Sequence, residues 1–161
     1  MPVTTDIVAS YRAPRSVFRR LVRLGQHEGR ALAVLMSGCA VFFISEWPRL
    51  AREAHLTNQE LNPLLGGSLM AWLFIAPLIF YVLAAVSQLV IRIIGGRASG
   101  FDARLALFWA WLVASPLKLL HGLMAGFVGP GPGLTVIGIA WLVAFLWFWG
   151  SNMREAGWGS P

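Results

Sequence analysis

Three ionisable residues lie in apolar parts of the chain and are its strongest candidates for chemistry. Glu46 stands near the end of one apolar stretch, and Lys118 and His121 stand within a later one. A charge inside a bilayer is costly and is usually paired or functional. Lys118 lies roughly 21 Å along a helix beyond Arg104, and Glu46 lies roughly 24 Å beyond Arg30. We therefore expect Glu46 and Lys118 to share a polar pocket in the outer half of a membrane. The alternative is that Lys118 snorkels alone to the surface.

His121 follows Lys118 by one helical turn and therefore lies on the same face. A histidine there could relay protons, ligate a pigment or haem, or pack within a polar pocket. No second histidine lies in an apolar stretch, because His27 and His55 stand in flanking segments. A bis-histidine haem is therefore not expected. Packing in a polar pocket is the preferred interpretation, and we expect no cofactor.

The sequence lacks the motifs of known catalytic sites. It contains no HExxH, P-loop, GxSxG or CxxC pattern. The single cysteine, Cys39, excludes an internal disulfide and a cysteine-based metal site. The glycine pair at Gly95 and Gly96 and the GPGPG run at 129–133 are interpreted as turns. We expect no catalytic residue, no metal ligand and no enzymatic activity.

The composition places the chain in a membrane. Of its 161 residues, 57% are hydrophobic and 12% are charged, whereas soluble domains carry about 25% charged residues. The mean hydropathy is +0.67. These values exclude an ordinary soluble domain and a disordered chain. The net charge of +6 comes from arginines that flank apolar runs, which is typical of membrane orientation and not of nucleic-acid binding.

Four apolar stretches approach the ~20 residues that a helix needs to cross a bilayer. The expected spans are about 31–47, 65–94, 103–128 and 134–149, within one domain at 31–150. We expect the first to end at Trp47 and Pro48. The second is too long for one perpendicular span, so it should tilt, project or kink at Pro77. The predicted fold class is an all-α polytopic membrane protein with four transmembrane helices.

Residues 1–30 are expected to form a short extended arm and then a basic amphipathic helix from Pro14. Apolar residues of this helix lie on one face and arginines on another. Such a helix can lie on a membrane surface and bind anionic headgroups. The alternative is a helix docked on the protein's own loops. The predicted headgroup-binding residues are Arg15, Arg19, Arg20 and Arg23.

Arginine distribution predicts the orientation. Most arginines lie before the first span, between the second and third spans, or after the fourth. The opposite side carries Arg49 and Arg52, offset by Glu53 and Glu60. Because cytoplasmic loops are enriched in basic residues, both termini should be cytoplasmic, including the short tail at 151–161. The start of the sequence is polar and does not resemble a signal peptide. We expect a multi-pass protein of the bacterial inner membrane.

Small residues at four-residue spacing predict close helix packing. The third span carries Gly122 and Gly126, and the fourth carries Ala140 and Ala144. Internal packing is the preferred interpretation, and homodimerisation is the alternative. The deep tryptophans either face lipid or pack between helices, and packing is preferred over a cofactor site: Trp109, Trp111 and Trp141.

Short motifs follow one another in a characteristic order along residues 10–150. A basic helix opens with Pro14 and carries Phe18, a proline-containing span ends at Gly95 and Gly96, and the next span contains Pro116. This order resembles the Yip-type (Ypt/Rab-interacting protein) membrane domain family in its compact bacterial form. The resemblance implies a multi-span helical protein with a cytoplasmic N-terminus. In eukaryotic members it implies Rab GTPase binding, vesicle traffic and membrane shaping. The chain differs from that pattern in its short N-terminal arm and in having four spans instead of five.

These observations favour a non-enzymatic inner-membrane protein of the Yip type. It would organise or shape the membrane through contacts with anionic lipid headgroups and with other membrane proteins or itself. The first alternative is an accessory subunit of a larger respiratory or photosynthetic complex. The second is a small oligomeric transporter whose polar path includes Glu46, Lys118 and His121.

Overall fold

The computed structural model describes residues 3–159, which are almost entirely helical and contain no strand. Four helical segments in this range are long and apolar enough to cross a membrane. The predicted all-α polytopic fold class is confirmed. The segments are α3 (Glu28–Thr57), the continuous run of α4 (Leu61–Met70), η1 (Ala71–Ile75) and α5 (Ala76–Ile93), α6 (Gly100–Phe127), and α7 (Pro132–Trp158).

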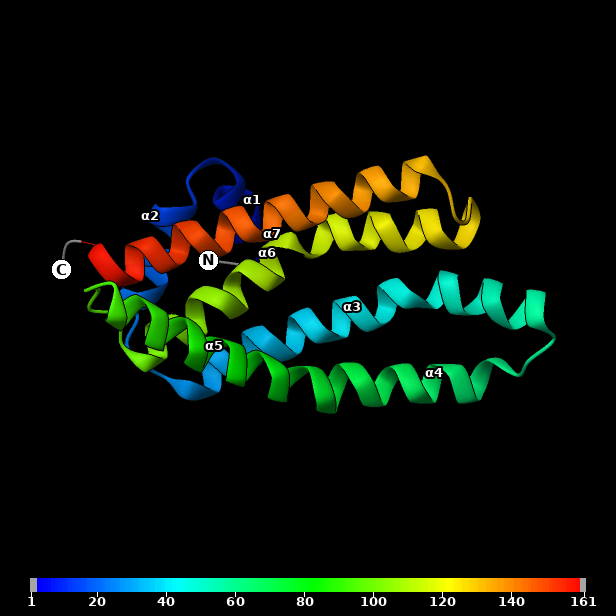
Figure 1. Cartoon of the computed structure of the whole chain (residues 1–161), viewed down its shortest axis with the longest axis horizontal. Helices are drawn as coiled ribbons and strands as arrows, with labels where there is room; N and C mark the ends of the chain where they lie inside the picture. The colour runs from blue at the N-terminus through cyan, green and yellow to red at the C-terminus, as the bar shows by residue number, and fades with distance from the viewer. Residues whose placement is uncertain (1–2, 160–161) are drawn as a thin grey trace.

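The four spans run up and down in chain order (Figure 1). The α3–α4 and α6–α7 turns lie at one end of the bundle. The α5–α6 connection and the C-terminal end of α7 lie at the other, called here the arginine-rich end. Helix α6 is central and contacts α3, α5 and α7. In its most apolar window 67% of residues are buried, against 11% in the second and fourth spans. The apolar sides of those two spans are therefore available to lipid.

An aromatic cluster around Trp111 joins α6 to its neighbours. Its indole stacks on Phe42 of α3, with ring centroids 3.7 Å apart. It also contacts Phe80 of α5 and Trp141 of α7 at 4.4 and 5.9 Å between centroids. Trp109 and Trp111 are both buried. Of the two alternatives, the structure therefore shows packing between helices for these two tryptophans.

The glycine step of α6 allows close approach of α3. A Cβ at Gly122 would lie 1.9 Å from the carbonyl oxygen of Ser45, and one at Gly126 would lie 2.2 Å from Cβ of Pro48. No side chain fits at either position without separating the two backbones. The α3–α6 contact therefore depends on these glycines, as small-residue steps do in membrane helices.

The alanine step of α7 behaves differently. Ala144 packs against the hydrophobic core, but Ala140 is exposed. No residue of 132–144 is fully buried, because this half of α7 is covered by neighbouring helices on one side only. Internal packing is therefore the wrong prediction for Ala140.

Two helices extend beyond the predicted span limits. Helix α3 continues through Pro48 to Thr57 instead of ending at the proline. Beyond Pro48, Arg49 forms an ion pair with Glu53 one turn away, which supports the added turns. The helix ends where Asn58 adopts a left-handed conformation with φ 52°.

Helix α7 likewise continues through most of the tail predicted at 151–161. Residues 151–158 are helical and packed, not a separate tail. Asn152 is buried and its Nδ2 donates to the carbonyl oxygen of Ala106 in α6 at 3.2 Å. Residues 160–161 of the predicted tail lie outside the described range. Apolar patterning missed these turns because a polar side chain holds them to α6.

The second span is a continuous helix with one irregular turn. The π-helical turn η1 ends at Ile75, two residues before Pro77. A proline has no N–H to donate and its ring crowds the carbonyl four residues earlier, here that of Leu73 within η1. Widening the turn relieves that contact. The predicted irregularity at Pro77 therefore takes the form of a π-turn.

The extended N-terminal arm is a wrong prediction, because Val3–Arg12 forms helix α1. Residues 1–2 lie outside the described range. Two hydrogen bonds hold α1 against α6. Tyr11 Oη donates to the carbonyl oxygen of Val113 at 2.8 Å, and Trp109 Nε1 donates to Ser10 Oγ at 3.1 Å. Helix α2 (Pro14–Arg23) follows after Ala13, so α1 and α2 form a hairpin beside α6 and α7 (Figure 1).

Candidate functional site

The structure brings Glu46 and Lys118 together at the α3–α6 contact. Lys118 Nζ lies 3.0 Å from Glu46 Oε1, and the two side chains are 16% and 12% exposed. The other carboxylate oxygen of Glu46 accepts from Arg49 Nε at 2.7 Å. Lys118 also lies over the Phe42 ring, 5.9 Å from its centroid, where a cation–π attraction adds to the contact. Both charges are therefore compensated, and the pair ties α3 to α6.

His121 lies beside this pair without bonding to it. Its Nδ1 is buried and has no hydrogen-bond partner among residues 3–159. On the α7 side, a Cβ at Gly138 would lie 3.4 Å from His121 Nε2, so the imidazole packs against that helix. No cluster of three or more histidine, cysteine, aspartate or glutamate side chains suited to a metal ion is found in the described part of the chain.

The basic helix α2 is docked on the bundle through its apolar side. Val17, Phe18 and Leu21 are buried, and Phe18 is completely covered. They pack against α6 and α7. The apolar side is therefore covered by the protein itself, as in the docked alternative, while the arginine side stays exposed.

The four predicted headgroup-binding arginines fall into two groups. Arg19 Nε lies 2.7 Å from Glu155 Oε1, and Arg20 forms an ion pair with Asp6. The hydrogen bond to Glu155 and its negative charge raise the pKa of Arg19 above its ordinary value. Within residues 3–159 the structure shows no ion pair for Arg15 or Arg23.

Helix α2 runs alongside the last turns of α7 in the same direction. Arg15 shares a cavity with Ser151, and Arg19 meets Glu155 one turn further along both helices. Arg23, one turn later again, lines a second cavity with Glu155. The start of α2 is therefore closer to the middle of the bundle than its end is.

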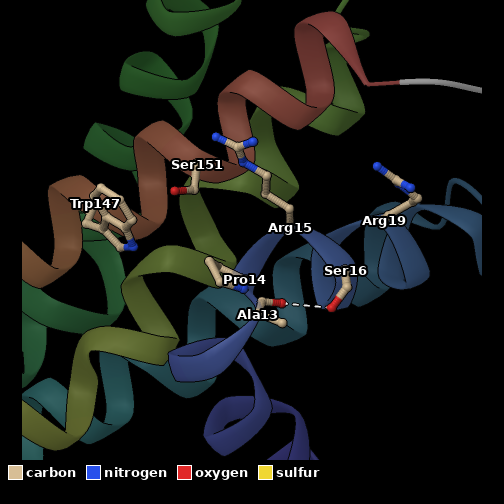
Figure 2. A pocket seen from close by; sticks show the side chains of 7 residues that line it. All are labelled: Ala13, Pro14, Arg15, Ser16, Arg19, Trp147 and Ser151. Atoms are coloured by element: carbon tan, nitrogen blue, oxygen red, sulfur yellow. Dashed lines mark hydrogen bonds between the residues drawn. The ribbon is translucent and has the colours of Figure 1, made fainter.

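The cavity between α2 and α7 has a volume of about 410 Å³ (Figure 2). Arg15 extends from α2 toward α7 and ends beside Ser151 (Figure 2). The Ser151 residue is 8% exposed, and its hydroxyl makes no hydrogen bond in the described part of the chain. Ser16 Oγ donates to the carbonyl oxygen of Ala13 at 2.9 Å. The cavity is lined by Ala13, Pro14, Arg15, Ser16, Arg19, Trp147 and Ser151.

Three of the motif residues behind the family resemblance, Pro14, Gly95 and Gly96, have clear structural roles. Pro14 occupies the first turn of α2, where its missing N–H costs nothing. Gly95 has φ +90° in the turn after α5, a conformation that favours glycine. A Cβ at Gly96 would come within 2.4 Å of the Ile91 side chain. Pro116 lies inside α6 on an exposed side.

Comparison with family models, curated proteins and solved structures finds no match for this chain. The resemblance to the Yip-type family therefore stays a prediction.

Sequence reasoning missed the two α7 residues of the cavity, Trp147 and Ser151. Trp147 and Ser151 are four residues apart on α7, and Arg15 and Arg19 are four residues apart on α2. This spacing is the only signal that the two helices could share a face. It becomes informative only when α2 is known to lie against α7, and the sequence does not show which helices are neighbours.

Proposed function

We propose that the chain is a non-enzymatic protein of the bacterial inner membrane, of the Yip type, that organises or shapes the membrane through lipid and protein contacts. The observation that carries the proposal is the docking of α2. Its apolar side is buried in the bundle while its arginines stay exposed. A rigidly held cationic surface therefore lies at the arginine-rich end of four membrane-spanning helices.

The charges on this surface favour anionic lipid. Arg12, Arg15 and Arg23 are exposed, and the structure shows no ion pair for them within residues 3–159. Guanidinium groups bind phosphate oxygens through paired hydrogen bonds. Each basic residue near an anionic leaflet contributes about 1 kcal/mol of attraction. Because cytoplasmic segments are enriched in arginine, this surface is assigned to the cytoplasmic side.

The proposal predicts selective retention of anionic lipid by the full-length protein. The protein would be extracted from its membrane in mild detergent, and the lipids that remain bound would be compared with the bulk membrane by mass spectrometry. Enrichment of anionic lipids is expected. Reconstitution at increasing protein density should also change vesicle diameter, as imaged by electron cryo-microscopy. Retained lipids with the bulk composition, together with unchanged vesicles, would contradict the proposal.

A second candidate, an accessory subunit of a larger membrane complex, is favoured by α4. None of the residues of α4 is buried, and a Cβ at Gly66 or Gly67 would meet nothing within 4 Å. Small residues of this kind allow another membrane helix to approach closely. Sizing of the same detergent extract discriminates the two. Stoichiometric co-elution with other membrane proteins supports the subunit, whereas a monomer or dimer with bound anionic lipid supports the first proposal.

A further inference from the structure

We propose that the cavity between α2 and α7 is a binding site for the phosphate group of one anionic lipid molecule. Arg15 and Ser151 would hold the phosphate, and Trp147 would contact the upper part of the acyl chains. The inference rests on the proposed function and deepens it, because it replaces a diffuse cationic surface with a defined site.

Two of the side-chain donors around the cavity, those of Arg15 and Ser151, are not used by the protein. Among residues 3–159, Arg15 has no ion pair. The Ser151 residue is 8% exposed and lines the cavity, and its hydroxyl has no hydrogen-bond partner there. The hydroxyl of Ser151 and the guanidinium of Arg15 are therefore both free to donate to an anion in the cavity.

The first turn of α2 adds further donors at the same place. The amides of Arg15 and Ser16 precede the first helical hydrogen bond, from Val17 N to the carbonyl oxygen of Ala13. No side chain caps this helix. Amides of a first turn favour an anion, to which the guanidinium of Arg15 adds a full positive charge.

The depth of the cavity selects a lipid phosphate over a soluble anion. Trp147 precedes the charged Arg154 by seven residues, which places it roughly 10 Å further into the membrane. Trp147 is 66% exposed, and so are its neighbours Val143 and Leu146 on α7, at 60% and 48%. Exposed tryptophan next to apolar surface marks the boundary between headgroups and acyl chains. In this position Arg15 contacts the phosphate of a lipid, while the apolar surface of α7 beside it contacts the acyl chains of the same lipid.

Arg19 and Arg20 are not expected to be the main phosphate ligands of this site. Glu155 and Asp6 already compensate Arg19 and Arg20. A further phosphate at either position would have to compete with a carboxylate. Arg15 alone combines a cavity, an unpaired guanidinium and an unpaired hydroxyl, so the site is expected to depend on Arg15 more than on any other arginine of α2.

The test measures binding of phosphatidylglycerol to purified full-length protein by native mass spectrometry, with phosphatidylcholine as the uncharged comparison. Arg15→Gln should weaken phosphatidylglycerol binding by about tenfold or more, because a charge-assisted hydrogen bond is lost. Ser151→Ala should weaken it by a few fold, and Trp147→Ala should weaken it without changing the preference for anionic lipid. Arg23→Gln is the matched comparison, because it removes the same charge from the same helix but lies outside this cavity. It removes only the diffuse attraction of one surface charge and should weaken binding by about fivefold at most, less than Arg15→Gln does.

The outcomes separate this inference from the proposed function. If wild type prefers phosphatidylglycerol but Arg15→Gln and Arg23→Gln weaken binding equally, the defined site is overturned while a diffuse cationic surface survives. If wild type shows no preference for the anionic lipid, both proposals fail. Inorganic phosphate at millimolar concentration should not displace the lipid. Displacement would assign the site to a soluble anion and overturn the lipid assignment. Unchanged melting temperatures would show that the variants are folded.

Discussion

Lys118 and Glu46 depend on each other unequally, although they form one ion pair. Glu46 also accepts a hydrogen bond from Arg49, whereas Lys118 has no second carboxylate among the described residues. Removing one partner of a buried pair costs up to about 3–5 kcal/mol, because the other charge is left uncompensated. Glu46→Gln should therefore destabilise the protein more than Lys118→Met does. Reversible unfolding in detergent or in bicelles measures both losses.

A double-mutant cycle provides the control for this pair. The variant carrying both substitutions leaves no orphaned charge at the α3–α6 contact, so its loss should be smaller than the sum of the single losses by about 0.5–3 kcal/mol. Additive losses would mean that the 3.0 Å contact contributes no coupling. A greater loss for Lys118→Met than for Glu46→Gln would contradict the role assigned to Arg49.

Tyr11 is the residue through which the docking of α1 can be measured. The residue is 46% exposed, and partial burial raises the pKa of its phenol above the ordinary value of 10.0. The neutral phenol donates to the carbonyl oxygen of Val113. Tyr11→Phe should lower the free energy of unfolding by about 0.5–1.5 kcal/mol at neutral pH.

The pH dependence of this effect has a definite sign. Because the folded-state pKa is raised, the unfolded chain ionises first, and the contribution of Tyr11 is complete below pH 10.0. It is lost as the pH rises through the folded pKa. The gap in stability between wild type and Tyr11→Phe should therefore shrink above that pH, as followed by tryptophan fluorescence during unfolding. A gap that grows with pH would contradict the docking of the neutral phenol on α6.

At the scale of the elements, the α3–α6 contact is the most sensitive to added volume. Gly122→Ala would place a methyl group 1.9 Å from the Ser45 carbonyl oxygen, so the helices must separate. Added volume in a packed core costs about 1–3 kcal/mol. We expect Gly122→Ala to lower stability by at least that amount, and the melting temperature in detergent to fall accordingly.

Gly66→Ala is the matched control for that substitution. It makes the same chemical change within a membrane-spanning helix, but its Cβ would meet nothing within 4 Å. Alanine is favoured over glycine in a helix by roughly 0.8–1.0 kcal/mol, so this variant should be neutral or stabilised. Equal losses for the two glycines would show that the close approach of α3 and α6 does not limit stability.

The helical elements differ in how well sequence patterns predict them. Apolar runs located all four spans, because each must cover the hydrocarbon core. Their ends were less predictable. Helix α3 passes through Pro48 because an ion pair supports the following turns, and α1 is helical because Tyr11 and Ser10 bond to α6. Such contacts depend on tertiary neighbours that a hydropathy pattern does not contain.

The candidate sites show the same division. The Glu46–Lys118 contact could be predicted because both residues lie on helices that run in the same direction, at similar calculated depth, and charge inside a bilayer demands a partner. The cavity between α2 and α7 could not be predicted. The cavity forms only because the start of α2, at Pro14, lies beside Ser151 of α7. The residue spacing within either helix does not indicate that the two helices pack side by side.

For the whole molecule, the up-and-down path puts the two ends of the bundle on opposite sides of a membrane. The α6–α7 turn lies at one end and the link between α2 and α3 lies at the other (Figure 1). Because arginines cluster at the second end, we expect that end in the cytoplasm and the α6–α7 turn outside.

Cysteine labelling tests this orientation with little background. The single native cysteine, Cys39, is fully buried, so wild type should react with a membrane-impermeant maleimide neither before nor after permeabilisation. Gly131→Cys places a thiol in the α6–α7 turn, where a Cβ meets nothing within 4 Å. Gln26→Cys places one in the exposed link between α2 and α3. In intact spheroplasts we expect labelling of Gly131→Cys alone, and labelling of both variants after permeabilisation. Labelling of Gln26→Cys alone in intact spheroplasts would show that the protein has the opposite orientation in the membrane. The α2 arginines would then face the outer leaflet, and the proposed recognition of anionic lipid on the cytoplasmic side would be wrong as well.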